Sequence, residues 1–215
     1  MKHQRTKEIL KNFSGINKSC LIREGDVIRI MNPEKTVFAQ ARVEDVFPRE
    51  FGVFDLPSLL STISLYDDAD ISYEEDHLLI SEGRRKARFY YTSTRHIKAA
   101  PAGDIKLPPT LMSFLLEKKE LEDMLKASAV MKLTNLYISG NKVVCKNSDG
   151  TGNDYELLIE NIDVAQDTNI EDINININID TLKLIPGDYD VSVTEKAILF
   201  KSTNSELQYV VILNN

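Results

Sequence analysis

Two short stretches, Asp68-Ala69-Asp70-Ile71-Ser72 and Asp188-Tyr189-Asp190-Val191-Ser192, share one pattern and lie 120 positions apart. Further matches lie at or near this offset, and a common offset with a common order indicates two copies of one folding unit. These pairs are Leu79-Ile80 with Leu199-Phe200, Phe89-Tyr90-Tyr91 with Tyr209-Val210-Val211, Leu10-Lys11 with Leu125-Lys126, and Asp55 with Asp180.

Each copy is expected to contain helices and short strands, in the order helix, strands, helix, strands. Apolar runs separated by Gly, Pro and Asn are typical of strands and turns, and Ile173, Ile175, Ile177 and Ile179 alternate with asparagines as in a strand with one buried face. The other expected strands are 18–23, 26–31, 36–43, 71–73, 78–81, 87–91, 136–139 and 142–145. The pattern predicts an α+β chain.

Four helices are expected. The first buries Ile9, Leu10 and Phe13, and the second begins after Asp55, a good N-cap, with Pro57 in its first turn. The third runs from about Glu117 to Met131, and the fourth opens at Asp180 and is stopped by Pro186-Gly187.

The stretch from Thr92 to Pro109 contains Pro101, Gly103, Pro108 and Pro109 and reads as an extended connection. We therefore expect an N-terminal domain at 1–98, a linker at 99–109 and a C-terminal domain at 110–215.

Charge argues against a protein that coats DNA with a uniformly basic surface. The chain has 26 basic and 33 acidic side chains, a net charge of −7. Residues 1–100 hold 16 basic and 15 acidic residues, and residues 101–215 hold 10 and 18, so the acidity lies in the second half. A local basic patch remains possible, because charges more than about 8 Å apart are largely screened at physiological salt.

Catalytic patterns are scarce. The three histidines, His3, His77 and His96, lack the spacing of a zinc site. Cys20 and Cys145 lie in strand-like runs and are expected to be reduced core residues. We expect no enzyme, no cofactor and no metal, although the clusters Asp67-Asp68-Asp70 and Glu74-Glu75-Asp76 leave a metal-dependent enzyme open as a minor alternative.

Basic side chains indicate a possible function more clearly than the catalytic patterns do. Arg84-Arg85-Lys86 and Arg88 lie on an expected strand and its turn, where a charged edge strand is the simpler interpretation. Lys7 and Lys11 share the polar face of the first helix, with Arg5 beside it, and Lys119 and Lys126 lie on that of the third. Taken alone, the polar face of each helix is interpreted as an ordinary solvent-exposed surface.

The whole pattern resembles the sliding clamps, specifically the DNA polymerase processivity factors of T4-like bacteriophages. The residues that carry the resemblance are Leu10-Lys11-Asn12-Phe13 with Ile16-Asn17, Phe54-Asp55-Leu56 with Leu59-Leu60 and Ile63-Ser64-Leu65, Asp68-Ala69-Asp70-Ile71-Ser72, Leu121 with Leu125-Lys126, Pro186-Gly187 with Tyr189, and Tyr209-Val210-Val211. Their order and spacing extend from Met1 to about Leu213.

The resemblance implies a DNA clamp fold with two similar processivity-fold domains, each with two helices packed on antiparallel sheets. Three subunits would close into a homotrimeric ring whose helices line a hole for double-stranded DNA, bound without sequence preference. Partners would be the DNA polymerase and an ATP-dependent clamp loader, with no membrane. The setting would be the cytoplasm of the infected host cell.

The resemblance also implies site residues. The candidates for DNA binding are Arg5, Lys7, Lys11, Lys119, Lys126 and Lys183; the second helix offers only Ser58, Ser61, Thr62 and Ser64. The candidates for a partner-peptide pocket near the linker and the last strand are Ile97, Leu107, Tyr209 and Val211. No C-terminal tail is expected after the last strand, and no secretion signal at the N-terminus.

One alternative of another class stays open at this point. A duplicated β-rich viral structural or scaffold protein would have the same repeat and composition, but it would bind coat protein instead of polymerase.

Overall fold

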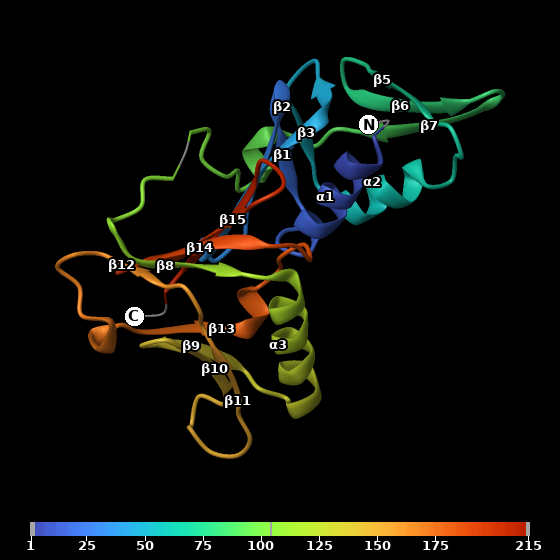
Figure 1. The fold of residues 1–215 in the computed structure, drawn as a ribbon. Coiled ribbons are helices and arrows are strands. Elements are labelled where there is room, and N and C mark those ends of the chain that lie inside the picture. Colours follow the sequence, from blue (N-terminus) through green and yellow to red (C-terminus); the bar gives the residue numbers. More distant parts are fainter. Residues whose placement is uncertain (1–2, 104, 214–215) are drawn as a thin grey trace. The chain divides into compact units, whose positions relative to one another are not determined.

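The structure, a computed structural model, describes residues 3–103 and 105–213. The chain divides into two compact units, unit 1 (Met1–Asp104) and unit 2 (Ile105–Asn215), both drawn in Figure 1. Each combines helices with antiparallel strands, which confirms the expected α+β class. The division lies inside the expected linker, and the expected boundaries at 98 and 110 remain predictions. None of the helices in the described part of the chain has both the length and the apolar character to span a membrane.

Unit 1 contains two helices and three small groups of antiparallel strands. Strand β1 pairs with β4, β2 pairs with β3, and β5, β6 and β7 form a three-stranded sheet in that order. The elements are α1 (Gln4–Ser14), β1 (Cys20–Ile22), β2 (Gly25–Met31), β3 (Val37–Phe47), β4 (Phe51–Val53), α2 (Leu56–Ile63), β5 (Asp70–Tyr73), β6 (His77–Glu82), β7 (Arg85–Tyr90) and the 3-10 turn η1 (Thr94–His96).

Unit 2 contains one long helix and two antiparallel strand groups. One has the order β11-β10-β9-β13, and the other runs β12-β8-β14-β15-β16. The elements are β8 (Thr110–Leu116), α3 (Lys118–Met131), β9 (Asn135–Ser139), β10 (Lys142–Lys146), β11 (Tyr155–Leu158), β12 (Asp163–Val164), η2 (Ile170–Asp172), β13 (Asn174–Asn178), η3 (Ile179–Thr181), β14 (Tyr189–Thr194), β15 (Ala197–Ser202) and β16 (Leu207–Ile212).

The strand pairings support the duplication. Ile71 of β5 lies opposite Ile80 of β6, and Val191 of β14 lies opposite Phe200 of β15. Both members of the second pair are 120 positions beyond those of the first. The repeated Asp-x-Asp-apolar-Ser pattern therefore starts the same hairpin in each unit.

The match proposed for the last strand of each unit is wrong by two residues. Ile80 lies opposite Ala87 in unit 1, whereas Phe200 lies opposite Tyr209 in unit 2, so the offset becomes 122. The turn between β15 and β16 is longer by two residues than the turn between β6 and β7. Phe89 is therefore not the structural counterpart of Tyr209.

The fourth expected helix is also wrong: only the single 3-10 turn η3 forms there. Asn178, not Asp180, is its N-cap, and the Asn178 side chain accepts a hydrogen bond from the Asp180 backbone N–H at 2.8 Å. Ile175 and Ile177 are buried as alternation predicts, but the strand ends at Asn178 and Ile179 enters the turn. Between residues 105 and 213, unit 2 thus has one α-helix where two were expected.

Part of the stretch from Thr92 to Pro109, which the sequence predicts to be extended, is tied to unit 1. The backbone N–H of Thr92 donates to the Gly52 carbonyl at 2.9 Å, and Arg23 donates to the Ala100 carbonyl at 2.9 Å. Gly52 has no room for a side chain, because a Cβ there would lie 2.6 Å from the Thr92 oxygen and 2.7 Å from the Ile97 side chain. This close approach requires glycine at position 52.

Both cysteines are free and buried, as expected. Burial raises the pKa of the Cys20 thiol to about 12, and burial also raises the pKa of Cys145. Only the thiolate reacts with disulfide reagents. We therefore predict that a chromogenic disulfide reagent at pH 8 labels neither thiol of the native protein and labels both after denaturation. Rapid stoichiometric labelling without denaturant would contradict this.

Candidate nucleic-acid interface

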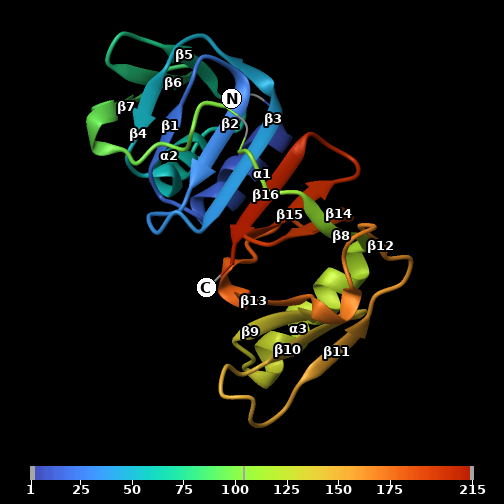
Figure 2. The same ribbon diagram turned by 90° about the vertical axis from the view of Figure 1, so that its left-hand side faces the viewer.

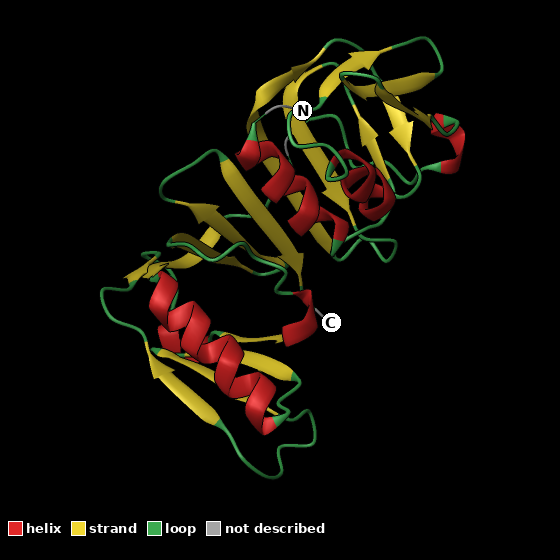
Figure 3. Ribbon diagram, turned by 90° about the vertical axis from the view of Figure 1, so that its right-hand side faces the viewer, coloured by secondary structure: helices red, strands yellow, loops and turns green. Residues whose placement is uncertain are grey.

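Helices α1 and α2 lie side by side in unit 1, as Figure 3 shows. The inner face of α1 buries Ile9, Leu10 and Phe13, and α2 buries Leu59 and Ile63. The Asp55 carboxylate accepts a hydrogen bond from the Ser58 backbone N–H at 3.1 Å, which begins α2 at the predicted position. The polar faces of both helices are exposed to solvent.

A hollow of about 350 Å³ lies between the two helices, and two predicted DNA-binding residues line it. Lys7 and Lys11 are one helical turn apart, so they lie on the same face of α1. Among the described residues neither ammonium group has an ion-pair partner. The remaining lining comes from Gln4, Glu8, Leu60, Ile63, Ser64 and Tyr66.

On α3 of unit 2, the basic residues are mostly neutralised. Lys119 pairs with Asp123 at 2.7 Å and Lys118 pairs with Glu122 at 3.7 Å. The hydrogen bond with Asp123 raises the pKa of Lys119. Lys126 is exposed and has no acidic partner in the described part of the chain, so it is the most available of the predicted cations on this helix.

The buried faces of α1 and α3 superpose at an offset of 115 residues. Thr6 and Leu121 are both buried, as are Ile9 and Met124, and Phe13 and Ser128. Lys11 and Lys126 are also 115 apart. The two lysines therefore occupy the same position relative to the core of their own units.

The two other predicted DNA-binding residues are less clearly placed. Arg5 is half-buried on α1 and pairs with Glu8 at 3.4 Å, an interaction that offsets its charge. Lys183 is exposed but follows η3 and lies outside any α-helix. The assignment of all six to a DNA interface remains a prediction.

The four residues predicted for a peptide pocket differ in exposure. Ile97, in unit 1, is 8% exposed, and Leu107, in unit 2, is half-buried. Tyr209 and Val211 are at most 1% exposed on β16, and the Tyr209 hydroxyl accepts a hydrogen bond from the Ile185 N–H at 3.2 Å. A peptide could reach these two side chains only after local rearrangement. Their grouping in one pocket remains a prediction.

Sequence reasoning missed the part that α2 and the residues after it play in the hollow. Ser64 was named as part of the family resemblance and as a polar residue of the second helix, and Tyr66 was assigned to no site. The sequence signal for this part of the hollow was the position of Ser64 and Tyr66, two residues apart just after the end of α2. A chain that leaves a helix can turn its side chains back toward the neighbouring helix. Together with Lys7 and Lys11, these groups form a mixed surface of hydroxyls and cations.

This arrangement suits weak contact with a polyanion. Lys7, Lys11 and Lys126, on two similar helices, have no ion-pair partner within residues 3–103 and 105–213. They can touch phosphate oxygens, and such contacts carry no sequence information. Tight binding takes more contacts: a protein that neutralises 6–10 phosphates binds strongly and with steep salt dependence.

Comparison with known proteins agrees with this picture. A family model described as DNA polymerase processivity factor matches residues 1–95. The sliding clamp of Vibrio phage KVP40 is 29% identical over 196 residues, which are 87% of this chain and 87% of that relative. The sliding clamp of Enterobacteria phage T4 is 26% identical, over 86% of this chain and 82% of its own length. That of Escherichia phage RB69 is 25% identical, over 95% and 92%.

Solved structures show the same fold at low identity. PCNA from Thermococcus kodakaraensis has a TM-score of 0.68 at 11% identity, covering 98% of this chain and 96% of that chain. The DNA polymerase III subunit beta from Pseudomonas aeruginosa has a TM-score of 0.64 at 16% identity, covering 98% of this chain and 63% of that chain. The chain therefore has the DNA clamp fold and is a relative of the sliding clamps of T4-like phages, its residues 1–95 matching the DNA polymerase processivity factor family.

Proposed function

We propose that this protein is a sliding clamp that encircles duplex DNA and tethers the replicative polymerase for processive synthesis. The observation that carries the proposal is the equivalent placement of Lys11 and Lys126, neither of which has an ion-pair partner among the residues described, on the repeated helices of a clamp fold. A surface repeated in this way suits a ligand whose own charge repeats, such as the DNA backbone.

Retention on DNA would be topological. The net charge of −7 and the paired states of Lys118, Lys119 and Arg5 leave few cations to hold phosphates. Weak, sequence-independent contacts permit movement along the duplex. A closed ring supplies the persistence that such contacts lack.

The ring would be a homotrimer, which gives six similar units around the hole. A head-to-tail contact generates a closed ring when the rotation between subunits closes. An ATP-dependent clamp loader would open it, and the chain itself would perform no catalysis and need no cofactor.

Partner proteins, the polymerase among them, would bind through short peptides, and Ile97, Leu107, Tyr209 and Val211 are the candidate contacts. A solved structure of A. fulgidus PCNA, bound to the C-terminal region of FEN-1, covers 96% of this chain with a TM-score of 0.68 at 11% identity. The phage origin of the curated relatives supports action in the cytoplasm of the infected host cell.

Assembly provides the first test. Native mass spectrometry at micromolar concentration should give a species of about 73 kDa, three times the 24.4 kDa subunit. The same preparation should stimulate the phage polymerase on primed circular DNA when the loader and ATP are present. A chain that stays monomeric at every concentration and leaves polymerase processivity unchanged would refute the proposal.

A further inference from the structure

The hollow between α1 and α2 combines three kinds of side chain in one cavity. Lys7 and Lys11 supply cations from α1, and Leu60 and Ile63 supply apolar surface from α2. The aromatic ring of Tyr66 completes the lining where the chain leaves α2. The volume of about 350 Å³ lies within the roughly 300–1,000 Å³ of ordinary ligand pockets, so a small organic group fits inside.

The positive charge in this hollow is available to a ligand. Neither Lys7 nor Lys11 has an ion-pair partner within residues 3–103 and 105–213. Glu8 also lines the hollow, but its carboxylate is already engaged by the Arg5 guanidinium and by the Gln4 side-chain amide, each at 3.4 Å. The two ammonium groups therefore dominate the local charge, and they favour an anionic ligand.

The Tyr66 ring is held in place by groups outside the hollow. The chain continues from α2 through Tyr66 into β5, the first strand of the sheet β5-β6-β7 (Figure 2). At the start of β7, the Arg85 guanidinium lies over the ring, 5.2 Å from its centroid, and donates a hydrogen bond to the Leu65 carbonyl at 3.2 Å. Arg85 also pairs with Glu82, whose carboxylate accepts a hydrogen bond from the Asp68 N–H at 2.7 Å. A ring fixed before the ligand arrives lowers the entropy cost of binding.

Cations beside a fixed aromatic ring are the two parts of a site for single-stranded nucleic acid. Phosphates meet the cations, and an unpaired base stacks on the ring, with an arginine adding a cation–π contact. A base inside a duplex cannot stack on a protein ring, because it must first leave the base stack. No other aromatic ring contacts Tyr66 among the residues described, so no stacked partner occupies that place.

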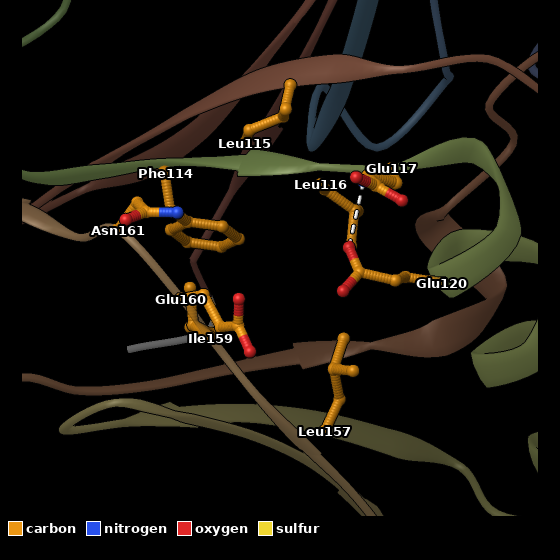
Figure 4. A pocket seen from close by; sticks show the side chains of 9 residues that line it. All are labelled: Phe114, Leu115, Leu116, Glu117, Glu120, Leu157, Ile159, Glu160 and Asn161. Atoms are coloured by element: carbon orange, nitrogen blue, oxygen red, sulfur yellow. Dashed lines mark hydrogen bonds between the residues drawn. The ribbon is translucent and has the colours of Figure 1, made fainter.

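A pocket of unit 2 has the opposite character (Figure 4). It measures about 100 Å³ and lies beside β11, and the charged residues that line it are all glutamates. The Glu120 carboxylate accepts a hydrogen bond from the Glu117 N–H at 2.9 Å, and Glu160 adds a third acidic group. Carboxylates repel a phosphate, so of these two cavities it is the hollow between α1 and α2 that suits a nucleotide.

We propose that this hollow binds one unpaired nucleotide of single-stranded DNA, with the phosphate on Lys7 and Lys11 and the base against Tyr66. The inference rests on the proposed function, because a primed template brings single-stranded DNA next to the duplex that a clamp encloses. It adds a contact that depends on an aromatic ring to contacts that depend on charge alone. Every base has a π-face, so the site accepts any of the four.

Substitution of Tyr66 tests the stacking contact. The probe is a short fluorescent oligothymidylate, and its binding to the protein is measured by fluorescence anisotropy at about 50 mM salt, where phosphate contacts are strong. Tyr66→Ala should raise the dissociation constant at least about fivefold, because the base loses the ring on which it stacks. Tyr66→Phe keeps the ring and should bind within about twofold of the parent chain.

Tyr137→Ala is the matched control. Tyr137 on β9 is also half-buried and also has a cation over its ring, the Lys146 ammonium at 4.5 Å from the centroid, but it lines neither cavity. This variant should bind the probe like the parent chain. Lys7→Ala should weaken binding of the oligothymidylate and of a blunt duplex alike, because both present phosphates. The loss caused by Tyr66→Ala should be larger for the single strand.

Photocrosslinking locates the base. An oligothymidylate with one iododeoxyuridine should crosslink to the peptide that contains Tyr66, as mapped by mass spectrometry, and circular dichroism verifies the fold of each variant. The site is refuted if the parent chain does not bind the probe, if Tyr66→Ala and Tyr137→Ala bind it equally well, or if the crosslink forms only elsewhere. Each of these results leaves the proposed ring standing, because trimer formation and processivity are measured without this probe.

Discussion

Replacing both Lys11 and Lys126 by glutamate is expected to reduce loading on primed circular DNA about tenfold or more at physiological salt. The change places a carboxylate at the equivalent position on α1 and on α3, where a phosphate oxygen would otherwise meet an ammonium group. Measurement of loader-dependent retention on DNA, with polymerase processivity as a second readout, tests this expectation.

The same variant should keep its fold and its assembly. Both lysines are exposed and lack ion-pair partners in the described chain, so the free energy of unfolding should change by no more than about 0.5 kcal/mol per site. Lys18→Glu with Lys35→Glu is the matched control, because it makes the same change in net charge at exposed sites off the helices. Wild-type loading by the Lys11 and Lys126 variant would remove these helices from the DNA interface.

The second large effect is expected in the core of unit 1. Phe47 is fully buried, and its ring packs edge-on against Phe51 at 6.1 Å and Tyr73 at 6.3 Å between ring centroids. Phe47→Ala should lower the free energy of unfolding by about 3–5 kcal/mol, through lost burial and the cavity left behind. Urea denaturation followed by circular dichroism measures this.

Phe54→Ala is the matched control for that experiment. Phe54 is 67% exposed just before α2, so the same substitution there should cost less than about 0.5 kcal/mol. Equal losses at the two positions would show that the aromatic cluster does not form the core of unit 1.

Helices and strands with clear periodicity could be predicted from the sequence. Burial of Ile9 and Phe13 follows from their helical spacing, and burial of Ile175 and Ile177 follows from strand alternation. The Asp55 N-cap and the order of the elements within each unit could also be predicted from the sequence, because each depends on local chemistry.

Other elements could not be predicted. Strand β8 lacks clean alternation, since Leu115 faces solvent among apolar neighbours, and the short strands β4 and β12 depend on their partners more than on their own sequences. The helix expected at Asp180 is reduced to one 3-10 turn, because Leu182, directly after it, leaves the helical conformation with a ψ of 68°.

The candidate site was only partly visible in the sequence. The presence of Lys7, Lys11, Lys119 and Lys126 on helix surfaces was predicted, but which of them are neutralised depends on the rotamers that join Lys119 to Asp123.

The central claim, that the protein is held on DNA by surrounding it, is tested most directly by comparing circular with linear duplexes. Loaded protein should persist on a covalently closed circle and leave within seconds once a restriction enzyme opens that circle, because free ends let a ring slide off. Equal retention on both forms, at the same salt and with the loader removed, would contradict the account.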